Sequence, residues 1–500
     1  MLFFKENLLL LIDVIFFKIR DQIQYNNNLF SSIIRFSITF LFHTVKQVLT
    51  AKSSYRQILG VAVPMSLAIM IPQLSILANS IFLGNYQSSD GLVFGKEALS
   101  VAGIAGIYYL VYAMVCFGLA SGLLMLMSRK AGNNEAIGVG SVFSAGVQIG
   151  LALTIVLIGV SFLFSSIFFD YSIQNEVVRQ LSKEFMVIRI FGLPFLFLAH
   201  LGNMLFIAVN KTSYMLWGTI GQTLVNIALD YFLIFGHGPF SELGIEGAAI
   251  ASVVAEIIFF LVVFCIIYYA HYFKAFKIRI FQKFQWDELV GYLSKSSPLM
   301  LQYLISIGGW EVFFIFIEHL GERELGASQI IRSAYGIIGI LVWALSNTTN
   351  SLVSNLYGQK KYDEIVPITK KICLLSISYT LIVVVILFFF QLDFLGLYTQ
   401  DEQIIALATP AFFVVLLASI LFSFSIIYFN TLLGLGDTKR SLVYEAITIS
   451  IYILFCYLVI EKQKPALWVA WTSEFVYWGC MLLFSGIYIH SKKWQPKSKL

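Results

Sequence analysis

Charged residues are scarce in this 500-residue sequence. Asp, Glu, Lys and Arg together make up 12% of it, whereas about 25% is usual in soluble proteins. Hydrophobic residues make up 59% of the chain, and the mean hydropathy is +0.83. This composition excludes an ordinary soluble protein and indicates a chain that lies largely within a lipid bilayer.

Cysteine and histidine are also few, with five and six residues. The cysteines lie within or beside apolar runs, and their spacing matches no metal-binding pattern. The sequence has no HExxH pair, Walker A phosphate loop or nucleophile elbow. We therefore expect neither an enzyme nor a bound cofactor, and we expect that ATP does not power this protein. The cysteines are Cys116, Cys265, Cys373, Cys456 and Cys480.

Long apolar runs are the main feature that the sequence does contain. A helix of about 20 apolar residues can cross the hydrocarbon core. Twelve runs in the sequence reach this length. They lack the alternation of polar and apolar residues that transmembrane β-strands show. The predicted fold class is therefore an all-α membrane protein with twelve transmembrane helices. The runs begin near Gln57, Ala98, Ala136, Met186, Ser213, Gly244, Leu293, Gly326, Val366, Ile404, Ser441 and Ala466.

The basic residues follow the spans in an alternating pattern, although the net charge is only +5. One set of loops is rich in Lys and Arg, and the opposite set holds few, including Arg179 and Lys183. The positive-inside rule then places both termini in the cytoplasm. Because these residues flank spans and form no single patch, a nucleic-acid partner is not expected. The rich set holds Arg129 and Lys130, Lys211, the connection from Lys274 to Lys295, Lys360 to Lys371, Lys439 and Arg440, and Lys492 to Lys499.

The segment 1–54 is an N-terminal extension of a different kind. Its apolar patches, Leu8–Phe17 and Ile33–Phe42, are too short to span a membrane and are interrupted by charges. We expect amphipathic helices on the cytoplasmic surface of the membrane, the alternative being a poorly ordered extension.

The rest of the chain contains an internal repeat. A shift that brings Leu119 onto Leu345 aligns LASGLLMLMSRKAGNNE with LSNTTNSLVSNLYGQKK, and after an eight-residue gap Glu256 meets Glu474. Each half holds six spans, so both halves enter the membrane in the same direction, related by a pseudo-two-fold axis along the membrane normal. The predicted parts are an N-lobe at 55–272, a cytoplasmic connection at 273–292, a C-lobe at 293–490 and a basic cytoplasmic tail at 491–500.

One acidic residue, Asp230, lies within the apolar stretch Gly221–Gly236. A charge at this depth costs roughly 2.5–3.5 kcal/mol on insertion scales, so such residues usually face a polar cavity and have a role there. Asn226 precedes it by four residues, which places both side chains on one helix face. Their oxygens suit a hard cation such as Na⁺, and the carboxylate also suits a proton. This pair is a candidate cation site.

Several motifs stand out in the spans and the loops between them. They are Pro64 with the turn at Gly84, SRKAGNNE and SNLYGQKK after the second and eighth spans, and NIALDYFLIFG followed by GIEGAAIAS. Together these motifs resemble the multidrug and toxic compound extrusion (MATE) family. The resemblance covers about Tyr55 to Trp494. It implies two six-helix lobes that exchange a Na⁺ or H⁺ gradient for the export of bulky, often cationic compounds. Flippases of lipid-linked oligosaccharides and peptidoglycan precursors belong to the same superfamily and supply the alternative.

The resemblance also implies a cation site in the N-lobe. It adds Asn203 on the fourth span and Ser252 on the sixth to Asn226 and Asp230, with Ser252 where the family usually has Thr. The chain departs from the family at Asn79, fifteen residues after Pro64, where an Asp is usual. A neutral amide can coordinate a cation but cannot carry a proton at physiological pH. Asn79 is therefore either part of the site with one charge missing, or a residue that joins helices by hydrogen bonds.

The C-lobe has its own charges, Glu311 and Glu318 on the seventh span and Arg332 on the eighth. Glu311 and Arg332 lie at similar depths below the turn near Glu322, so they are expected to form a structural ion pair, a buried Arg being least costly when paired. Arg332 is the one Arg that the sequence clearly places inside a span. Further acids lie in later spans, and the match of Glu256 with Glu474 favours a scaffold role shared by the lobes. The third acid is Glu445.

The sequence thus predicts a multi-pass secondary antiporter of a bacterial inner membrane. The expected partners are a small-molecule substrate, a coupling H⁺ or Na⁺ and the bilayer, and the expected state is a monomer. A flippase should instead have a strongly basic central cavity, which the single span Arg does not favour.

Overall fold

The computed structural model describes residues 54–88, 93–280, 283 and 286–495. The predicted amphipathic extension lies, except for its last residue, outside the described residues, as does the second half of the basic tail. Within the described ranges, twelve helices are long and apolar enough to cross a membrane, and no strand is present apart from an isolated bridge between Gln87 and Phe94. The predicted fold class is confirmed.

The first six spans form the N-lobe. Its fourth span is interrupted by a short 3-10 turn, η1, and a small helix, α10, follows the sixth span. The elements are α3 (Tyr55–Gly84), α4 (Gly95–Gly132), α5 (Ala136–Ser172), α6 (Glu176–Arg189), η1 (Ile190–Gly192), α7 (Leu193–Ala208), α8 (Ser213–Phe235), α9 (Gly244–Tyr269) and α10 (Tyr272–Ala275).

The C-lobe repeats this order with six further spans. Its fifth span ends in a wider π-helical segment, η3. The elements are α11 (Trp286–Glu318), α12 (Glu322–Gly358), η2 (Tyr362–Glu364), α13 (Ile365–Phe389), α14 (Gln391–Gly396), α15 (Glu402–Gly434), α16 (Thr438–Phe455), η3 (Cys456–Glu461), α17 (Leu467–Ala470) and α18 (Ser473–His490).

The element boundaries reproduce the repeat. The fourth span runs from Glu176 to Ala208, and the tenth helix of the bundle, α15, runs from Glu402 to Gly434. Both pairs of ends are related by the shift that brings Leu119 onto Leu345. Both spans are preceded by the same kind of cap, because the side chains of Asn175 and Asp401 accept hydrogen bonds from the first backbone amides of their helices. Each lobe therefore folds by the same local rules.

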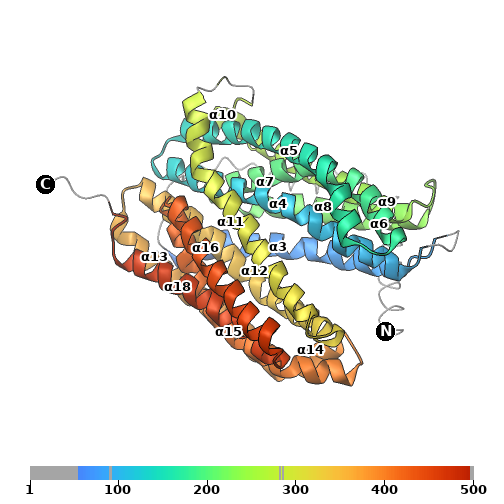
Figure 1. Cartoon of the computed structure of the whole chain (residues 1–500). Helices are drawn as coiled ribbons and strands as arrows, with labels where there is room; N and C mark the ends of the chain where they lie inside the picture. The colour runs from blue at the N-terminus through green and yellow to red at the C-terminus, as the bar shows by residue number, and fades with distance from the viewer. Residues whose placement is uncertain (1–53, 89–92, 281–282, 284–285, 496–500) are drawn as a thin grey trace, which may run out of the picture. The chain divides into compact units, whose positions relative to one another are not determined.

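The two lobes meet through their first two spans. Figure 1 shows the N-lobe helices in blue to green and the C-lobe helices in yellow to red, with α11 alongside α4. Helix α4 packs on α11 and α12, and α3 packs on α12. The hydrophobic clusters reflect this contact, since Ala344 of α12 belongs to the N-lobe cluster whereas Ile58 and Ala62 of α3 belong to a C-lobe cluster.

At one end of this contact, α4 and α12 cross at a pair of repeat-related glycines. A Cβ atom on Gly132 would lie 2.0 Å from the carbonyl oxygen of Asn355, and one on Gly358 would lie 2.3 Å from that of Arg129. Arg129 and Asn355 are themselves equivalent in the repeat. Only glycine permits backbones to approach this closely, so the glycines of SRKAGNNE and SNLYGQKK hold the lobes together at the end that the charge pattern assigns to the cytoplasm.

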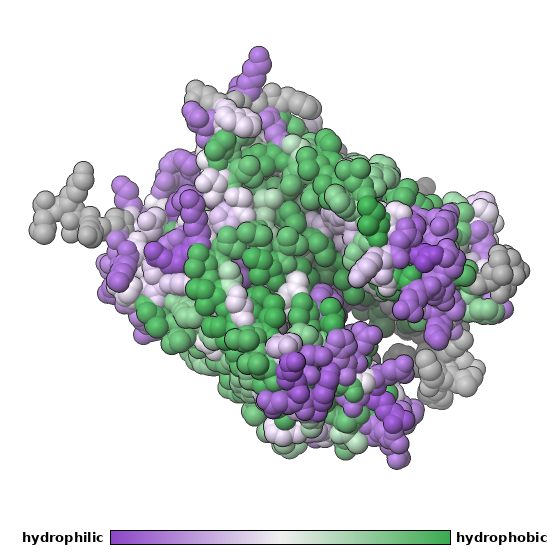
Figure 2. Space-filling view, viewed as in Figure 1, coloured by the Kyte–Doolittle hydropathy of each residue, from purple (hydrophilic) through white to green (hydrophobic). Residues whose placement is uncertain are grey.

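The outer surface of the helices is apolar. Figure 2 shows hydrophobic residues over the middle of the bundle and hydrophilic residues gathered toward the helix ends. Large apolar side chains lie open on it, including Leu163 and Phe389, which are 69% and 75% exposed. Such a surface is stable against lipid rather than water.

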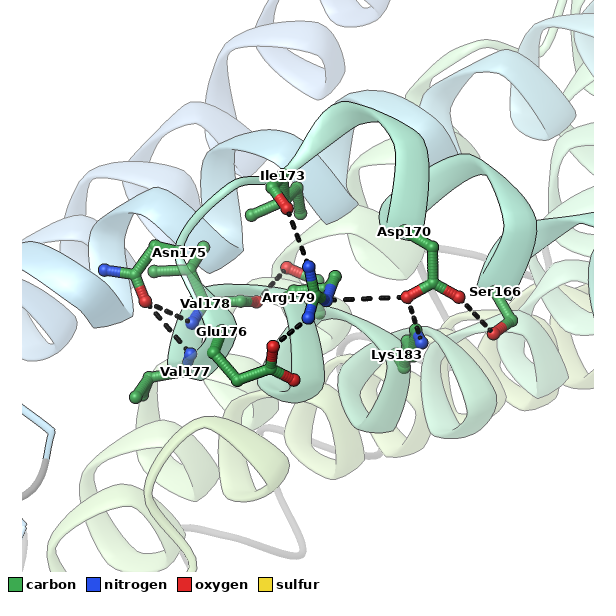
Figure 3. A network of polar contacts seen from close by, with 10 residues as sticks. Ser166, Asp170, Ile173, Asn175, Glu176, Val177, Val178, Arg179 and Lys183 are labelled. Carbon is green, nitrogen blue, oxygen red and sulfur yellow. Dashed lines mark hydrogen bonds and ion pairs between the residues drawn. The ribbon is translucent and has the colours of Figure 1, made fainter.

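Two basic residues at the charge-poor end of the bundle, Arg179 and Lys183, are paired with acids. At the junction of α5 and α6, Lys183 Nζ lies 2.6 Å and Arg179 Nε 3.4 Å from Asp170, and Arg179 also contacts Glu176 (Figure 3). These cations are thus neutralised locally.

Candidate functional site

Asp230 lies at the centre of a polar cluster between α3 and α8. Its side chain is completely buried. Oδ2 accepts hydrogen bonds from Nδ2 of Asn79, at 3.2 Å, and from Nδ2 of Asn226, at 3.3 Å. The Oδ1 atom of Asn226 in turn accepts from the hydroxyl of Ser75. The structure therefore brings Asn79, Asn226 and Asp230 together, an arrangement that both of the roles expected for Asn79 allow.

Helical spacing creates this cluster. Ser75 and Asn79 are four residues apart on α3, and Asn226 and Asp230 are four residues apart on α8, so each pair projects from one face of its helix. The two faces meet because α3 packs on α8. Ser75 is a member that the sequence analysis missed, although its position one turn before Asn79 was a usable signal.

The second carboxylate oxygen of Asp230 is not used in this cluster. This atom, Oδ1, is buried and has no hydrogen-bond partner among the described residues. A buried acceptor without a partner is costly, and each one calls for an explanation. A proton on Oδ1 or a cation bound to it would remove the cost, and the amide oxygens of Asn79 and Asn226 are further ligands of the type that Na⁺ takes. The residues present therefore fit either coupling ion.

Asn203 and Ser252, the other members of the predicted site, are not joined to Asp230 by any hydrogen bond in the described part of the chain. Asn203 is buried on α7, and its own Oδ1 has no partner there. Ser252 is half-buried on α9. Their participation stays a prediction.

A second buried cluster adjoins this site. Arg189, at the end of α6, forms two hydrogen bonds with the carboxylate of Glu256 on α9, at 2.6 and 2.8 Å. The ring of Tyr109 lies 3.8 Å from the guanidinium, and its hydroxyl donates to Glu256. Arg189 also acts electrostatically on Asp230. A Cβ atom on Gly192 would collide with Glu256 at 1.8 Å, so the turn η1 makes room for this ion pair.

Arg189 corrects two of our expectations. The fourth span runs from Glu176 to Ala208 and so begins ten residues before the predicted start at Met186. Arg189 lies inside the span with either boundary, so Arg332 is not the one Arg within a span. A buried ion pair joins Arg189 with Glu256, whereas no ion pair joins Glu311 with Arg332 in the described part of the chain. The guanidinium of Arg332 instead lies 5.0 Å from the ring centroid of Trp310 and 5.2 Å from that of Phe314.

The prediction that Glu318 is a third buried charge of the C-lobe is also wrong. Glu318 is exposed at the last residue of α11. Glu311 is half-buried on the same helix, within electrostatic reach of Arg332 but not in contact with it.

A cavity with polar and aromatic walls lies inside the described bundle, mainly in the C-lobe. Its volume is about 600 Å³, which falls in the range of sites for drug-sized ligands. Residues from α3, α4 and α7 of the N-lobe complete the wall. The lining includes Phe117, His200, Trp310, Arg332, Tyr335, Trp343, Phe422, Glu445, Tyr452, Glu474, Tyr477 and Trp478.

Two carboxylates line this cavity. Glu445 accepts hydrogen bonds from Ser306 and, at 2.8 Å, from Tyr477, and Glu474 accepts one from Nε1 of Trp478 at 3.0 Å. Both residues are almost fully buried. Aromatic rings beside carboxylates form a surface that attracts an organic cation.

The match of Glu256 with Glu474 has a structural counterpart. Tyr109, which donates to Glu256, is equivalent by the repeat to Tyr335, which lies beside Glu474. The basic partner is not repeated, because Val415 occupies the C-lobe position equivalent to Arg189. Of these two equivalent residues, Glu256 therefore forms an ion pair in the N-lobe, whereas Glu474 faces a cavity in the C-lobe.

Comparison with known proteins places these features in a family. Residues 64–232 and 298–458, more than half of the chain, match the model of the MatE family. The two segments begin at Pro64 and Pro298, so the family pattern follows the repeat. These prolines lie further apart than Leu119 and Leu345 do, because the loop after α3 is longer than the loop after α11.

Individual relatives of the chain are also named as transport or multidrug resistance proteins. The chain is 26% identical over 321 residues to a "Probable multidrug resistance protein NorM" of Synechocystis, and the alignment covers 62% of this chain and 66% of that protein. It thus spans slightly less than two thirds of that relative. An "FAD transporter" of Shewanella oneidensis is 24% identical over 364 residues, which is 70% of this chain and 75% of that protein.

Solved structures share the fold. One described as an outward-facing conformation of a multidrug resistance MATE family transporter has a TM-score of 0.79 at 16% identity, covering 90% of this chain and 99% of that one.

Proposed function

The chain belongs to the MatE family of multidrug and toxic compound transporters, and from this premise we propose that it is a secondary antiporter. It exports bulky cationic or amphipathic compounds in exchange for H⁺ or Na⁺, by alternating access, from the inner membrane of a bacterium with both termini in the cytoplasm. The matched segments cover both lobes, so the proposal concerns the whole bundle rather than one half.

The observation that carries the proposal is the unpartnered Oδ1 of Asp230. This atom is buried, belongs to the only acid of its cluster, and has no hydrogen-bond partner among the described residues. A coupling ion must bind in one state of a transporter and leave in another, and an oxygen without a fixed protein partner meets this requirement.

The C-lobe cavity is the proposed substrate site. Its aromatic walls supply flat surfaces for a planar compound, and Glu445 and Glu474 supply negative charge. Its volume of about 600 Å³ suits a bulky compound.

Cavity charge favours this function over the two alternatives. A flippase of lipid-linked pyrophosphates, or a carrier of a dinucleotide such as the named substrate of the Shewanella relative, would need a basic cavity. Here Arg332 is opposed by Glu445 and Glu474 on the same lining. Arg189, the second Arg inside a span, is neutralised by Glu256 and does not line the cavity.

The decisive experiment compares Asp230→Asn with the parent in proteoliposomes, using a panel of planar organic cations under imposed Na⁺ and pH gradients. We expect gradient-driven uptake or efflux to fall about tenfold or more, equivalent to at least about 1.4 kcal/mol of coupling. Exchange of labelled for unlabelled substrate without a gradient should persist. The matched control is Asp363→Asn, which removes the same charge from an exposed position in η2.

Two results would overturn the proposal. Full gradient-driven transport by Asp230→Asn would remove this residue from coupling. If the parent moved none of the organic cations, with either gradient, but moved lipid-linked or phosphorylated compounds, the antiporter assignment would be replaced by the flippase alternative. Glu445→Gln and Glu474→Gln separate the substrate site from the coupling site, since each should weaken substrate binding about tenfold while leaving ion binding unchanged.

A further inference from the structure

A second large pocket lies at the end of the bundle that carries the Arg129 contact. Its volume is about 730 Å³, and it is formed where the ends of α4, α12, α15, α16 and α18 meet the start of α11. It is separate from the C-lobe cavity, with which it shares no lining residue. The residues that line it are Arg129, Lys295, Tyr357, Leu435, Gly436, Asp437, Arg440, Tyr444, Ile487, Tyr488, Ser491, Lys493 and Trp494.

The pocket is strongly basic. Four cationic side chains line it, and Asp437 is the one acid on the lining. That acid is already occupied, because Arg440 contacts its Oδ2 at 2.9 Å and the hydroxyl of Tyr488 donates to the same oxygen at 2.8 Å. The positive charge of Arg129, Lys295 and Lys493 is therefore not balanced by any acid on the lining.

The donors of this pocket are only partly used. Arg129 donates to backbone carbonyl oxygens through one terminal nitrogen, while its Nε is buried without a partner among the described residues. The side chains of Lys295 and Lys493 form no ion pair or hydrogen bond with another described residue, and both residues are exposed. A buried guanidinium nitrogen without an acceptor is costly, and it indicates that an acceptor belongs there.

We propose that this pocket binds a phosphate group. A phosphate offers several acceptor oxygens, matches the geometry of a guanidinium and attracts several cations at once. The charge pattern assigns this end of the bundle to the cytoplasmic face, where acidic phospholipids present phosphates at the depth of the helix ends. The aromatic side chains of Tyr357, Tyr444 and Trp494 suit such an interfacial position.

The location gives the site a consequence for transport. Arg129 belongs to the N-lobe, whereas Arg440 belongs to the C-lobe and Lys493 to the tail that follows it. A phosphate that contacts both sides adds to the forces holding the lobes together at this end, so it binds the closed arrangement in preference to an open one.

The test measures the rise in Tm of the purified full-length protein in a neutral detergent as ligand is added. Three probes are used: short-chain phosphatidylglycerol, short-chain phosphatidylcholine with the same acyl chains, and glycerol 3-phosphate. The variant is Lys295→Gln/Lys493→Gln, which changes two exposed side chains. The matched control is Lys370→Gln/Lys439→Gln, which removes the same charge from exposed positions outside the pocket.

We expect phosphatidylglycerol to raise the Tm in a salt-dependent manner, and we expect the pocket variant to bind it about tenfold or more weakly than the parent and the control. If glycerol 3-phosphate acts as well as the lipid, the ligand is a soluble phosphate compound. If only phosphatidylglycerol acts, the ligand is a lipid headgroup. The proposal is overturned if phosphatidylcholine has the same effect, if the two double variants respond alike, or if no phosphate probe changes the Tm.

Discussion

The guanidinium of Arg129, at the end of α4, donates a hydrogen bond to the carbonyl oxygen of Leu435, just after α15, at 2.7 Å. The same guanidinium lies 4.4 Å from the ring centroid of Tyr357 on α12. One side chain of the N-lobe therefore contacts two segments of the C-lobe, beside the crossing of Gly132 and Gly358. Under the proposed alternating access, this contact acts as a gate that is closed on the Arg129 side.

Replacing Arg129 should loosen that gate. A hydrogen bond from a charged donor contributes about 1.5–3 kcal/mol, so Arg129→Ala is expected to raise the population open on this side by about tenfold to a hundredfold. The measurement is maleimide labelling of Ser351→Cys, read at the level of the peptide. Ser351 is suitable because it is 1% exposed and is bonded to Ser128 across the crossing.

Lys130→Ala is the matched control for this experiment. Lys130 is the next residue, carries the same charge and pairs with Glu135 at 2.7 Å within the N-lobe. It should leave the labelling rate unchanged. Equal labelling of the parent and Arg129→Ala would show that Arg129 does not hold the gate.

The ion pair of Arg189 and Glu256 predicts a large stability effect. Removing one partner leaves a buried charge uncompensated, so Arg189→Met or Glu256→Gln alone should destabilise the protein by roughly 3–5 kcal/mol. The double replacement should recover much of this loss. Unfolding of all four proteins in one detergent gives the coupling energy of the cycle.

Glu311 and Arg332 supply the comparison for that cycle. They interact without contact, so their coupling energy should stay below about 1 kcal/mol. Additive losses in the Arg189 and Glu256 cycle would mean that these residues do not depend on one another. A large coupling between Glu311 and Arg332 would restore the ion pair that the structure does not contain.

Much of this arrangement was predictable from sequence because it follows from length and period. Twelve apolar runs determine twelve spans, and the repeat determines two lobes with the same chain direction. The spacing of Asn226 and Asp230 is enough to place them on one face of α8. Asn79 could be brought to them only through the family resemblance, since nothing in the sequence of α3 says which helix its polar face meets.

The errors have physical causes as well. Equal depth of Glu311 and Arg332 does not determine how α11 and α12 are rotated about their axes, and Arg332 is turned toward Trp310 and Phe314. Arg189 lies within the run that begins near Met186, but a single charge lowers the hydropathy of a long apolar window too little to stand out. The start of that run was placed too late, because the helix itself begins at Glu176, where Asn175 caps it. A cap signal of this kind would have corrected the boundary.

Asn79 is the position where the geometry permits the sharpest test of the coupling site. Its Nδ2 donates to Asp230 at 3.2 Å, so Asn79→Asp replaces a donor with a second carboxylate at hydrogen-bonding distance. Two carboxylates that share a site resist ionising together. A cation or a shared proton relieves this repulsion, so the variant should bind the coupling ion more tightly than the parent.

The expected result is a pH profile of transport that moves toward higher pH by about one unit or more, because the site of the variant keeps a proton where the parent loses it. Asn79→Ala is the control, since it removes the same donor without adding charge and should lack this shift. If the pair instead shares Na⁺, the Na⁺ concentration for half-maximal transport should fall while the pH profile stays in place. Identical pH and Na⁺ profiles in the parent and Asn79→Asp, with both proteins folded, would exclude Asn79 from the ion site and leave it only the role of a hydrogen bond between α3 and α8.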